Sequence, residues 1–210
     1  MPRSGALSTL VVAALAMVPV AARAEAPPPS EVGVEIGSLS YSGSGCPQGS
    51  AAVIFSADRQ EFTVLYSAFA LETGPGLAGA ARKDCQLHLK MRIPKGWSYA
   101  LTNVDFSGFA ALDPGVVASL ESRYHLSGEG PVRVDALELA GPYEPNDYVH
   151  RDAFPDGSLS SACGKGKNVQ IKTSVRISNK PNPEGAGVIF VDATDGALQQ
   201  TYRLAWTRCK

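Results

Sequence analysis

The sequence predicts an all-β protein, an antiparallel β-sandwich of the jelly-roll or Ig-like type with about ten strands and two disulfides. Residues 85–93 alternate apolar and polar side chains without a break, so an extended strand there would have one dry and one wet face. Similar short stretches recur along the chain, separated by glycine, proline and aspartate residues that favour turns. Four cysteines in a chain with an export signal indicate two disulfides.

The chain begins with this export signal. Arg3 supplies a positive charge, residues 6–20 are almost wholly apolar, and an Ala-x-Ala cleavage pattern ends at Ala24. The apolar run is too short to span a bilayer comfortably. The expected divisions are a signal peptide over 1–24, a proline-rich tether over 25–30 and a single secreted domain over 31–210.

Charge and hydropathy limit the partners of the mature chain. Removing the signal takes away Arg3 and Arg23, so the formal net charge changes from −1 to −3. Both signs are dispersed, unlike the basic footprint of a nucleic-acid-binding protein. No apolar run after the signal is long enough to cross a membrane. We therefore expect a secreted protein, extracellular or, in a Gram-negative bacterium, periplasmic, whose partner is an unknown extracellular ligand rather than nucleic acid.

The four cysteines, Cys46, Cys85, Cys163 and Cys209, are spread along the domain. No Cys-x-x-Cys pair is present, so the spacing does not favour a metal site. Four cysteines allow three connectivities. We favour Cys46–Cys85 with Cys163–Cys209, which places one disulfide in each half of the domain.

The rest of the chain divides into strands and turns, with no convincing helix. Asp195-Gly196 is the expected hairpin turn between the last two strands. Residues 141–167 contain three prolines, four glycines and little periodicity, which predicts a long ordered loop. The expected strands are residues 32–36, 51–56, 61–71, 85–93, 98–106, 118–126, 131–139, 169–177, 188–192 and 199–208.

A series of short motifs runs in a fixed order through the domain. Together they resemble domain of unknown function 4360, a family of small secreted proteins from fungi and bacteria, over about Val34 to Cys209. The resemblance implies export, an all-β fold and four paired cysteines, and it assigns no activity and no catalytic residues. The motifs are Gly-Ser-Gly-Cys-Pro at 43–47, Gly-Ser at 49–50, Cys-Gln-Leu at 85–87, Pro-Lys-Gly at 94–96, Val-Asp-Phe at 104–106 with Gly108, Cys-Gly at 163–164 with Asn168, and Asp192, Asp195-Gly196, Tyr202, Leu204, Trp206 and Cys209 at the end.

No complete catalytic motif is present in the sequence. The glycine-rich stretch 164–168 lacks the spacing and the Ser or Thr of a phosphate-binding loop, and neither Gly-x-Ser-x-Gly before a helix nor His-Glu-x-x-His occurs. His88 and His125 fall on the water-facing sides of predicted strands. They would hold a metal only if those strands were neighbours and an acidic residue joined them.

The remaining candidates for metal binding or catalysis are aspartates. They could bind calcium or form the carboxylate pair of a glycoside hydrolase, but most lie beside glycine or proline, where turn formation explains them. We therefore predict no cofactor and no metal, and leave calcium open at Asp105, Asp192 and Asp195. The candidates are Asp105, Asp113, Asp152, Asp156, Asp192 and Asp195.

Aromatic and charged residues outside the predicted strands are the candidates for ligand binding. Loops on a rigid scaffold commonly bind, and tyrosine offers a large contact area at a low cost in entropy. The leading hypothesis is a non-enzymatic binding module for a glycan, a protein or an envelope component. The alternatives are a hydrolase whose acidic pair is assembled by the fold and a structural envelope protein. The predicted binding residues are Trp97, Tyr143, Tyr148, His150 and Arg151.

Overall fold

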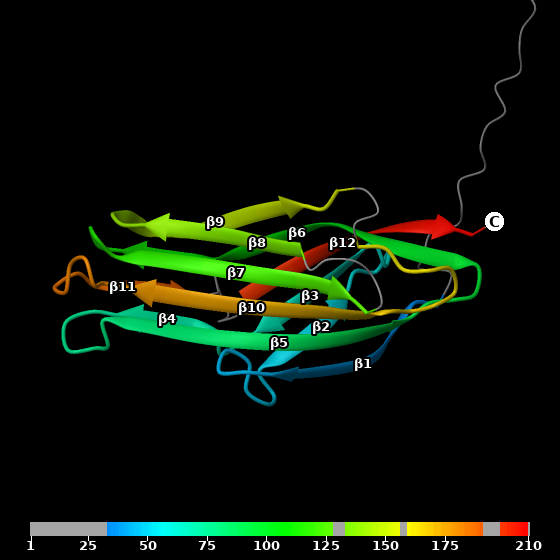
Figure 1. The fold of residues 1–210 in the computed structure, drawn as a ribbon, viewed down its shortest axis with the longest axis horizontal. Helices are drawn as coiled ribbons and strands as arrows, with labels where there is room; N and C mark the ends of the chain where they lie inside the picture. Colours follow the sequence, from blue (N-terminus) through cyan, green and yellow to red (C-terminus); the bar gives the residue numbers. More distant parts are fainter. Residues whose placement is uncertain (1–32, 128–132, 156–158, 191–197, 210) are drawn as a thin grey trace, which may run out of the picture.

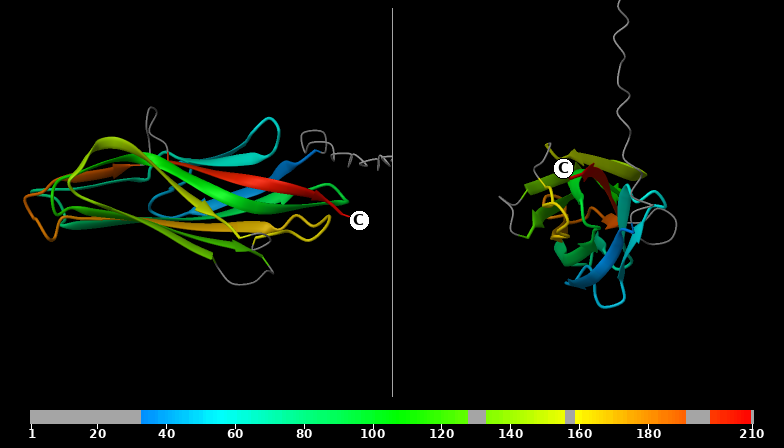
Figure 2. Two further views of the ribbon diagram at one scale, coloured as in Figure 1. Left: turned by 90° about the horizontal axis from the view of Figure 1, so that it is seen from above. Right: turned by 90° about the vertical axis from the view of Figure 1, so that its right-hand side faces the viewer.

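The computed structural model describes residues 33–127, 133–155, 159–190 and 198–209. These residues form twelve strands in two antiparallel sheets, packed as a sandwich that is elongated along its strands (Figures 1 and 2). Among the described residues no helix is long and apolar enough to cross a membrane. The expected signal peptide and tether lie outside the described residues. The strands are β1 Glu35–Ser42, β2 Ala51–Phe55, β3 Glu61–Tyr66, β4 Ala70–Thr73, β5 Ala80–Arg92, β6 Trp97–Leu112, β7 Val117–Leu126, β8 Arg133–Ala140, β9 Tyr143–Ala153, β10 Asn168–Ser178, β11 Gly187–Phe190 and β12 Leu198–Arg208.

The first sheet contains five strands in the order β1-β5-β10-β7-β8. β10 pairs with both β5 and β7 along almost its whole length, without a shift in register. The alternation predicted in β5 is confirmed, because Leu87, Leu89 and Met91 are buried. Gln86 and Lys90, which alternate with them, are exposed.

The second sheet contains seven strands built around β6, which is 16 residues long. β9 pairs with one side of β6, while β12 and then β11 pair with the other side, one after the other. β3 and β4 lie one step further out, paired with β12 and β11 respectively, and β2 pairs with β3. At two positions across the sheet, therefore, two short strands follow each other end to end: β12 and β11 beside β6, and β3 and β4 one step further out.

The predicted hairpin between the last two strands is wrong. β11 ends with Phe190 opposite Phe109 of β6. β12 also pairs antiparallel with β6, from Gln199 opposite Ser107 onward, so β11 and β12 run in the same direction along one strand. The turn proposed at 195–196 lies outside the described residues.

Residues 61–71, expected as one strand, form β3 and β4. The backbone N–H of Ser67 donates to the carbonyl of Ser50, 2.9 Å away, which continues the β2–β3 pairing by one residue past the end of β3. The ring of Phe69 is buried against Gly45, where a Cβ would lie 1.9 Å from it. Burying this ring turns the chain away from a regular strand, and only glycine fits beneath it.

The long loop expected over residues 141–167 is wrong for the part that forms β9. Among the described residues this strand pairs only with β6, and residues 144–147 are all exposed, so the alternation that marks a half-buried strand is missing there. Pro145 lies within β9, and proline is compatible with an edge strand because one side of the ladder is unpaired. β9 and the split of residues 61–71 together account for twelve strands instead of ten.

Both favoured disulfides are confirmed. Cys46–Cys85 is buried and ties the glycine-rich loop after β1 to β5. Cys163–Cys209 joins the segment before β10 to the residue after β12. It lies at the C-terminal end of the sandwich, opposite the connection between β10 and β11 (Figure 1).

The two sheets meet in an apolar core that contains a buried polar network centred on Gln200. Gln200 of β12 donates a hydrogen bond from Nε2 to the hydroxyl of Thr173 on β10, 3.0 Å away, and so crosses from one sheet to the other. The Thr173 hydroxyl is also hydrogen-bonded to Ser122, at 3.0 Å. The phenols of Tyr202 and Tyr66 donate to Gln200 Oε1 at 2.8 and 3.4 Å. Buried polar atoms that are all paired favour one relative placement of the sheets.

Candidate functional site

Four connections meet at the end of the sandwich opposite the C-terminus (Figure 1). They join β4 to β5, β6 to β7, β8 to β9 and β10 to β11. These connections and the adjoining strand ends line a cleft of about 690 Å³, which we call the end cleft. Small-ligand sites typically have volumes of roughly 300–1,000 Å³. The end cleft is therefore large enough for a small ligand.

Hydrogen bonds between the connections hold the cleft in shape. Asp113 donates its backbone N–H to the carbonyl of Ala186 at 2.9 Å, and its Oδ2 accepts the N–H of Ala186 at 2.8 Å. Gly141 donates to the carbonyl of Val116 at 2.8 Å. A Cβ on Gly141 would lie 1.9 Å from the Asp113 carbonyl oxygen, so this close approach requires glycine.

The lining of the end cleft is largely apolar. Leu77, which is 52% exposed, and the half-buried Tyr143 and Val188 contribute to it. Proline lines the cleft from three of the four connections and from the start of β9. Walls stiffened in this way lose little conformational entropy when a ligand binds. The lining prolines are Pro75, Pro114, Pro142 and Pro145.

Two exposed glutamates lie on opposite sides of the cleft. Glu72 of β4 lies opposite Val188 of β11, and Val188 lies opposite Ala111 of β6. Glu144 lies on β9, beyond β6, beside the register shift next to Ala111. The backbones of the two glutamates are three strand spacings apart, about 14 Å. Glycosidase pairs need carboxyl groups roughly 5–10 Å apart, a separation that these two side chains would reach only if both extended toward each other across the cleft.

Of the predicted binding aromatics, only Tyr143 lines the end cleft. The other two are buried. Tyr148 is 5% exposed and contributes to the core between the sheets, and this burial raises the pKa of its phenol. Trp97 is 6% exposed and lies at the other end of the sandwich, where its carbonyl accepts the N–H of Gly164 beside the second disulfide.

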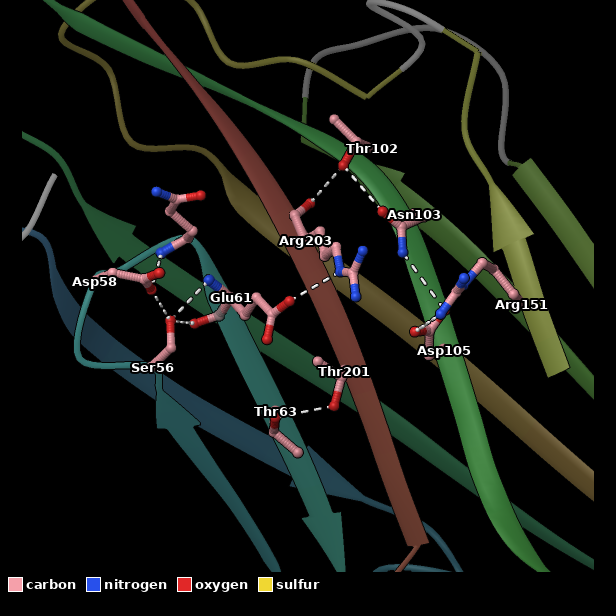
Figure 3. A network of polar contacts seen from close by, with 11 residues as sticks. Ser56, Asp58, Glu61, Thr63, Thr102, Asn103, Asp105, Arg151, Thr201 and Arg203 are labelled. Atoms are coloured by element: carbon pink, nitrogen blue, oxygen red, sulfur yellow. Dashed lines mark hydrogen bonds and ion pairs between the residues drawn. The ribbon is translucent and has the colours of Figure 1, made fainter. Parts of the chain in front are cut away.

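His150 and Arg151 connect β9 to its neighbours. His150 Nε2 lies 3.0 Å from Asp135 Oδ2 on β8, so this contact joins the edges of the two sheets. Arg151 donates from Nε and a terminal nitrogen to the two oxygens of Asp105 on β6, at 2.6 and 2.8 Å (Figure 3). The hydrogen bond from Arg151 lowers the pKa of Asp105, against the opposing effect of burial.

The part of the chain that the structure describes contains no group of three or more His, Cys, Asp and Glu residues that could hold a metal. Asp105 is paired with Arg151, and Asp113 accepts the backbone N–H of Ala186. His88 and His125 are not on neighbouring strands, because Gln170 of β10 lies between them in the same row. Asp156, Asp192 and Asp195 lie outside the described residues.

Sequence reasoning missed most of the end cleft. Leu77, Glu72 and Glu144 come from separate parts of the chain, and only the sheet order brings them together. One signal was present, because each of the four connections contains a Gly-Pro, Asp-Pro or Asn-Pro step. Each step reads as an isolated turn, and nothing local indicates that the four turns meet at one end.

Comparisons with known proteins identify a family and a secreted relative. The family model described as "Domain of unknown function (DUF4360)" matches residues 32–209. An "Uncharacterized secreted protein" of the fungus Arthroderma benhamiae is 29% identical over 185 residues, which are 88% of this chain and 74% of the relative. Together with the two disulfides, this relative shows that the protein is secreted.

A comparison with solved structures finds the enzymatically active domain of tailspike protein 4 from bacteriophage CBA120, with 14% sequence identity. The match covers 81% of this chain but only 20% of the tailspike chain, so this chain spans about a fifth of that protein. The TM-score is 0.29, which is too low to support an argument about fold or activity.

Proposed function

The chain belongs to the DUF4360 family, and we propose that it is a secreted, non-enzymatic binding module that holds an extracellular ligand in the end cleft. The observation that carries this proposal is the meeting of four proline-bearing connections around a cleft of about 690 Å³ with a mainly apolar lining. A concave apolar site with a few polar groups is the usual form of a small-ligand site.

The two glutamates of the cleft suggest the chemistry of the ligand. Glu72 and Glu144 flank a row of apolar side chains and form no ion pair with another described residue. A ligand with amino or hydroxyl groups at both ends and an apolar centre would match this pattern. Short oligomers of amino sugars carry amino and hydroxyl groups around rings whose C–H faces are apolar, so they are the first class to test.

The other two hypotheses have less support. A hydrolase would need its two carboxyl groups closer than the backbone spacing of Glu72 and Glu144 suggests. A purely structural envelope protein would need no cleft, and its connections would be under no constraint to meet. Binding is the function that uses the observed arrangement.

The proposal is tested by NMR titration of the labelled protein with glucosamine oligomers and with N-acetylglucosamine oligomers. We expect chemical-shift changes at the amides of Ala111, Tyr143 and Val188. Tyr143→Ala should weaken binding about tenfold, since an aromatic anchor in a pocket often contributes about 1–2 kcal/mol. Shift changes confined to the other end of the sandwich would reject the end cleft as the site.

The matched control is Tyr41→Ala. Tyr41 is also half-buried, but it lies on β1 of the five-stranded sheet, where its hydroxyl accepts the N–H of Gly49. This variant should bind as the wild type does, even if its melting temperature falls. If both tyrosine variants lose affinity equally, the loss comes from general destabilisation and the role of Tyr143 is rejected.

A further inference from the structure

The outer face of the five-stranded sheet has an unusual side-chain composition near the Cys163–Cys209 end. Three successive rows cross β1, β5 and β10 there, centred on Lys90, His88 and Gln86 of β5, and the last two rows also cross β7. Their outward side chains are serine, asparagine, glutamine, histidine, lysine and arginine. None of those that the structure describes in these rows is a carboxylate. We call this surface the polar face.

The positive charge of the polar face is only partly neutralised. The row next to it contains Asp84 and Glu121, and these carboxylates form ion pairs with Arg82 and Arg123. Lys90 and Lys172 are exposed and form no ion pair within the described parts of the chain. The face therefore has free cationic groups, although the whole protein has a formal net charge of −1.

The cations are spaced along the sheet rather than gathered at one point. Lys172 lies opposite Gln86, which is four residues from Lys90 along β5. At the rise of a strand, this places the two lysines about 14 Å apart. Between them, beside Lys90, is a depression of about 400 Å³ lined also by Ser38, Ser40, His88 and Asn168. Hydroxyl, amide and imidazole groups thus accompany the charge.

We propose that the polar face binds an anionic polysaccharide, a sugar chain that carries carboxylate or sulfate groups. Spaced cations on a flat sheet match charges that repeat along a polymer, and the serine, asparagine and glutamine side chains match its hydroxyl groups. The proposal is independent of the end cleft, which lies at the opposite end of the sandwich and carries glutamates.

Two observations favour an anionic sugar over other polymers. Proteins that bind single-stranded nucleic acid generally stack its bases on aromatic side chains. The described outward side chains of the polar face include no Phe, Tyr or Trp. Neutral sugars have no charge for Lys90 and Lys172 to recognise, so charge complementarity selects the acidic ones.

The test measures binding of the exported protein to polygalacturonate, to heparin and to neutral dextran, at about 0.03 M and about 0.3 M salt. We expect binding to one or both polyanions at low salt, weaker binding at high salt, and none to dextran. Polygalacturonate and heparin distinguish carboxylate from sulfate recognition. Lys90→Ala with Lys172→Ala should weaken binding roughly fivefold to tenfold, since each exposed charge contributes modestly.

The matched control is Lys180→Ala with Arg208→Ala, which removes the same charge from exposed positions outside the polar face. This double variant should change affinity less than about twofold. Equal losses in the two double variants would mean that only net charge matters, and would overturn the proposal. Failure of both polyanions to bind at low salt would also overturn it, as would equal or tighter binding of a single-stranded oligonucleotide.

Discussion

The two sheets of the sandwich differ in continuity. In the five-stranded sheet β5, β7 and β10 have 13, 10 and 11 residues, and β10 pairs with both of the others without interruption. In the seven-stranded sheet only β6 runs the full length, and it faces β12 and β11 in turn. The breaks place short strands and their connections at one end of the molecule, where the end cleft lies.

The outer faces of the two sheets also differ in their side chains. The five-stranded sheet presents rows of charged and hydroxyl side chains at regular spacings. The seven-stranded sheet carries the ion pairs Arg203–Glu61 and Arg151–Asp105 and a hydrogen-bonded pair, Thr63 with Thr201 at 3.1 Å (Figure 3). It also exposes apolar side chains such as Ile54 and Val149, which are 54% and 69% exposed. Continuous strands thus suit a repeating polymer, whereas interrupted strands supply the concave end that suits a small ligand.

The strongest test of how these unlike sheets are joined is Gln200→Ala. Gln200 is fully buried and links Tyr202 of its own sheet to Thr173 of the other. Its removal leaves a cavity and deprives both hydroxyl groups of a partner. We expect the free energy of unfolding to fall by about 3 kcal/mol. Denaturant unfolding at equilibrium measures this loss.

The control for this variant is the neighbouring Gln199→Ala. Gln199 is exposed on the same strand, so its replacement should change stability by less than about 0.5 kcal/mol. A comparably small effect of Gln200→Ala would show that packing alone aligns the sheets. The polar network would then have no part in joining them.

A smaller change in stability, of opposite sign, is expected at the edge of the seven-stranded sheet. The hydroxyl of Tyr148 on β9 is buried without a hydrogen-bond partner among the described residues. Tyr148→Phe removes this unpaired group and should leave stability unchanged or raise it by about 1 kcal/mol. Thermal and denaturant unfolding of the purified variant measure the change.

Tyr202→Phe provides the matched comparison for Tyr148→Phe. Tyr202 is equally buried, but its hydroxyl donates to Gln200, so its loss should destabilise the protein by about 1 kcal/mol. If both variants lose stability by the same amount, the Tyr148 hydroxyl has a hydrogen-bond partner outside the described residues. The contrast between the two tyrosines would then disappear.

The difference between the two sheets also explains which strands could be predicted from the sequence and which could not. β5 was predicted because one of its faces is buried by the other sheet and the opposite face is wet, which produces strict alternation. β9 was missed because, as an edge strand, it buries only Tyr148 fully. Its residues carry no periodic signal, and the single buried side chain resembles an aromatic in a loop.

The end cleft could not be predicted for a different reason. Glu72, Ala111 and Val188 become neighbours because β11 pairs with β6 and β4 pairs with β11. The predicted hairpin would have paired the last two strands with each other instead. Local patterns identify strands, but pairing between distant strands depends on packing of the whole core, so the site appears only with the topology.

The smallest expected change in stability concerns one ion pair on the outer face of each sheet. Asp105 of β6 accepts two hydrogen bonds from Arg151, and its side chain is 17% exposed. Glu121 of β7 is paired with Arg123, but both side chains are about half exposed, at 45% and 53%. Water weakens the second pair more than the first. Asp105→Asn should therefore cost more stability than Glu121→Gln, although no more than about 1 kcal/mol.

The dependence on pH separates the charge of Asp105 from its packing. Its pKa is lowered in the folded protein, chiefly by Arg151, from an ordinary value of 3.8. The ionised carboxylate therefore stabilises the fold above this value, and the contribution is lost as the pH falls through the lowered pKa. Denaturant unfolding at about pH 7 and about pH 3 should show a difference between wild type and Asp105→Asn that shrinks at the lower pH. A difference that stays constant would mean that Asp105 acts through its shape and neutral hydrogen bonds, and the two outer faces would then not differ in the strength of their ion pairs.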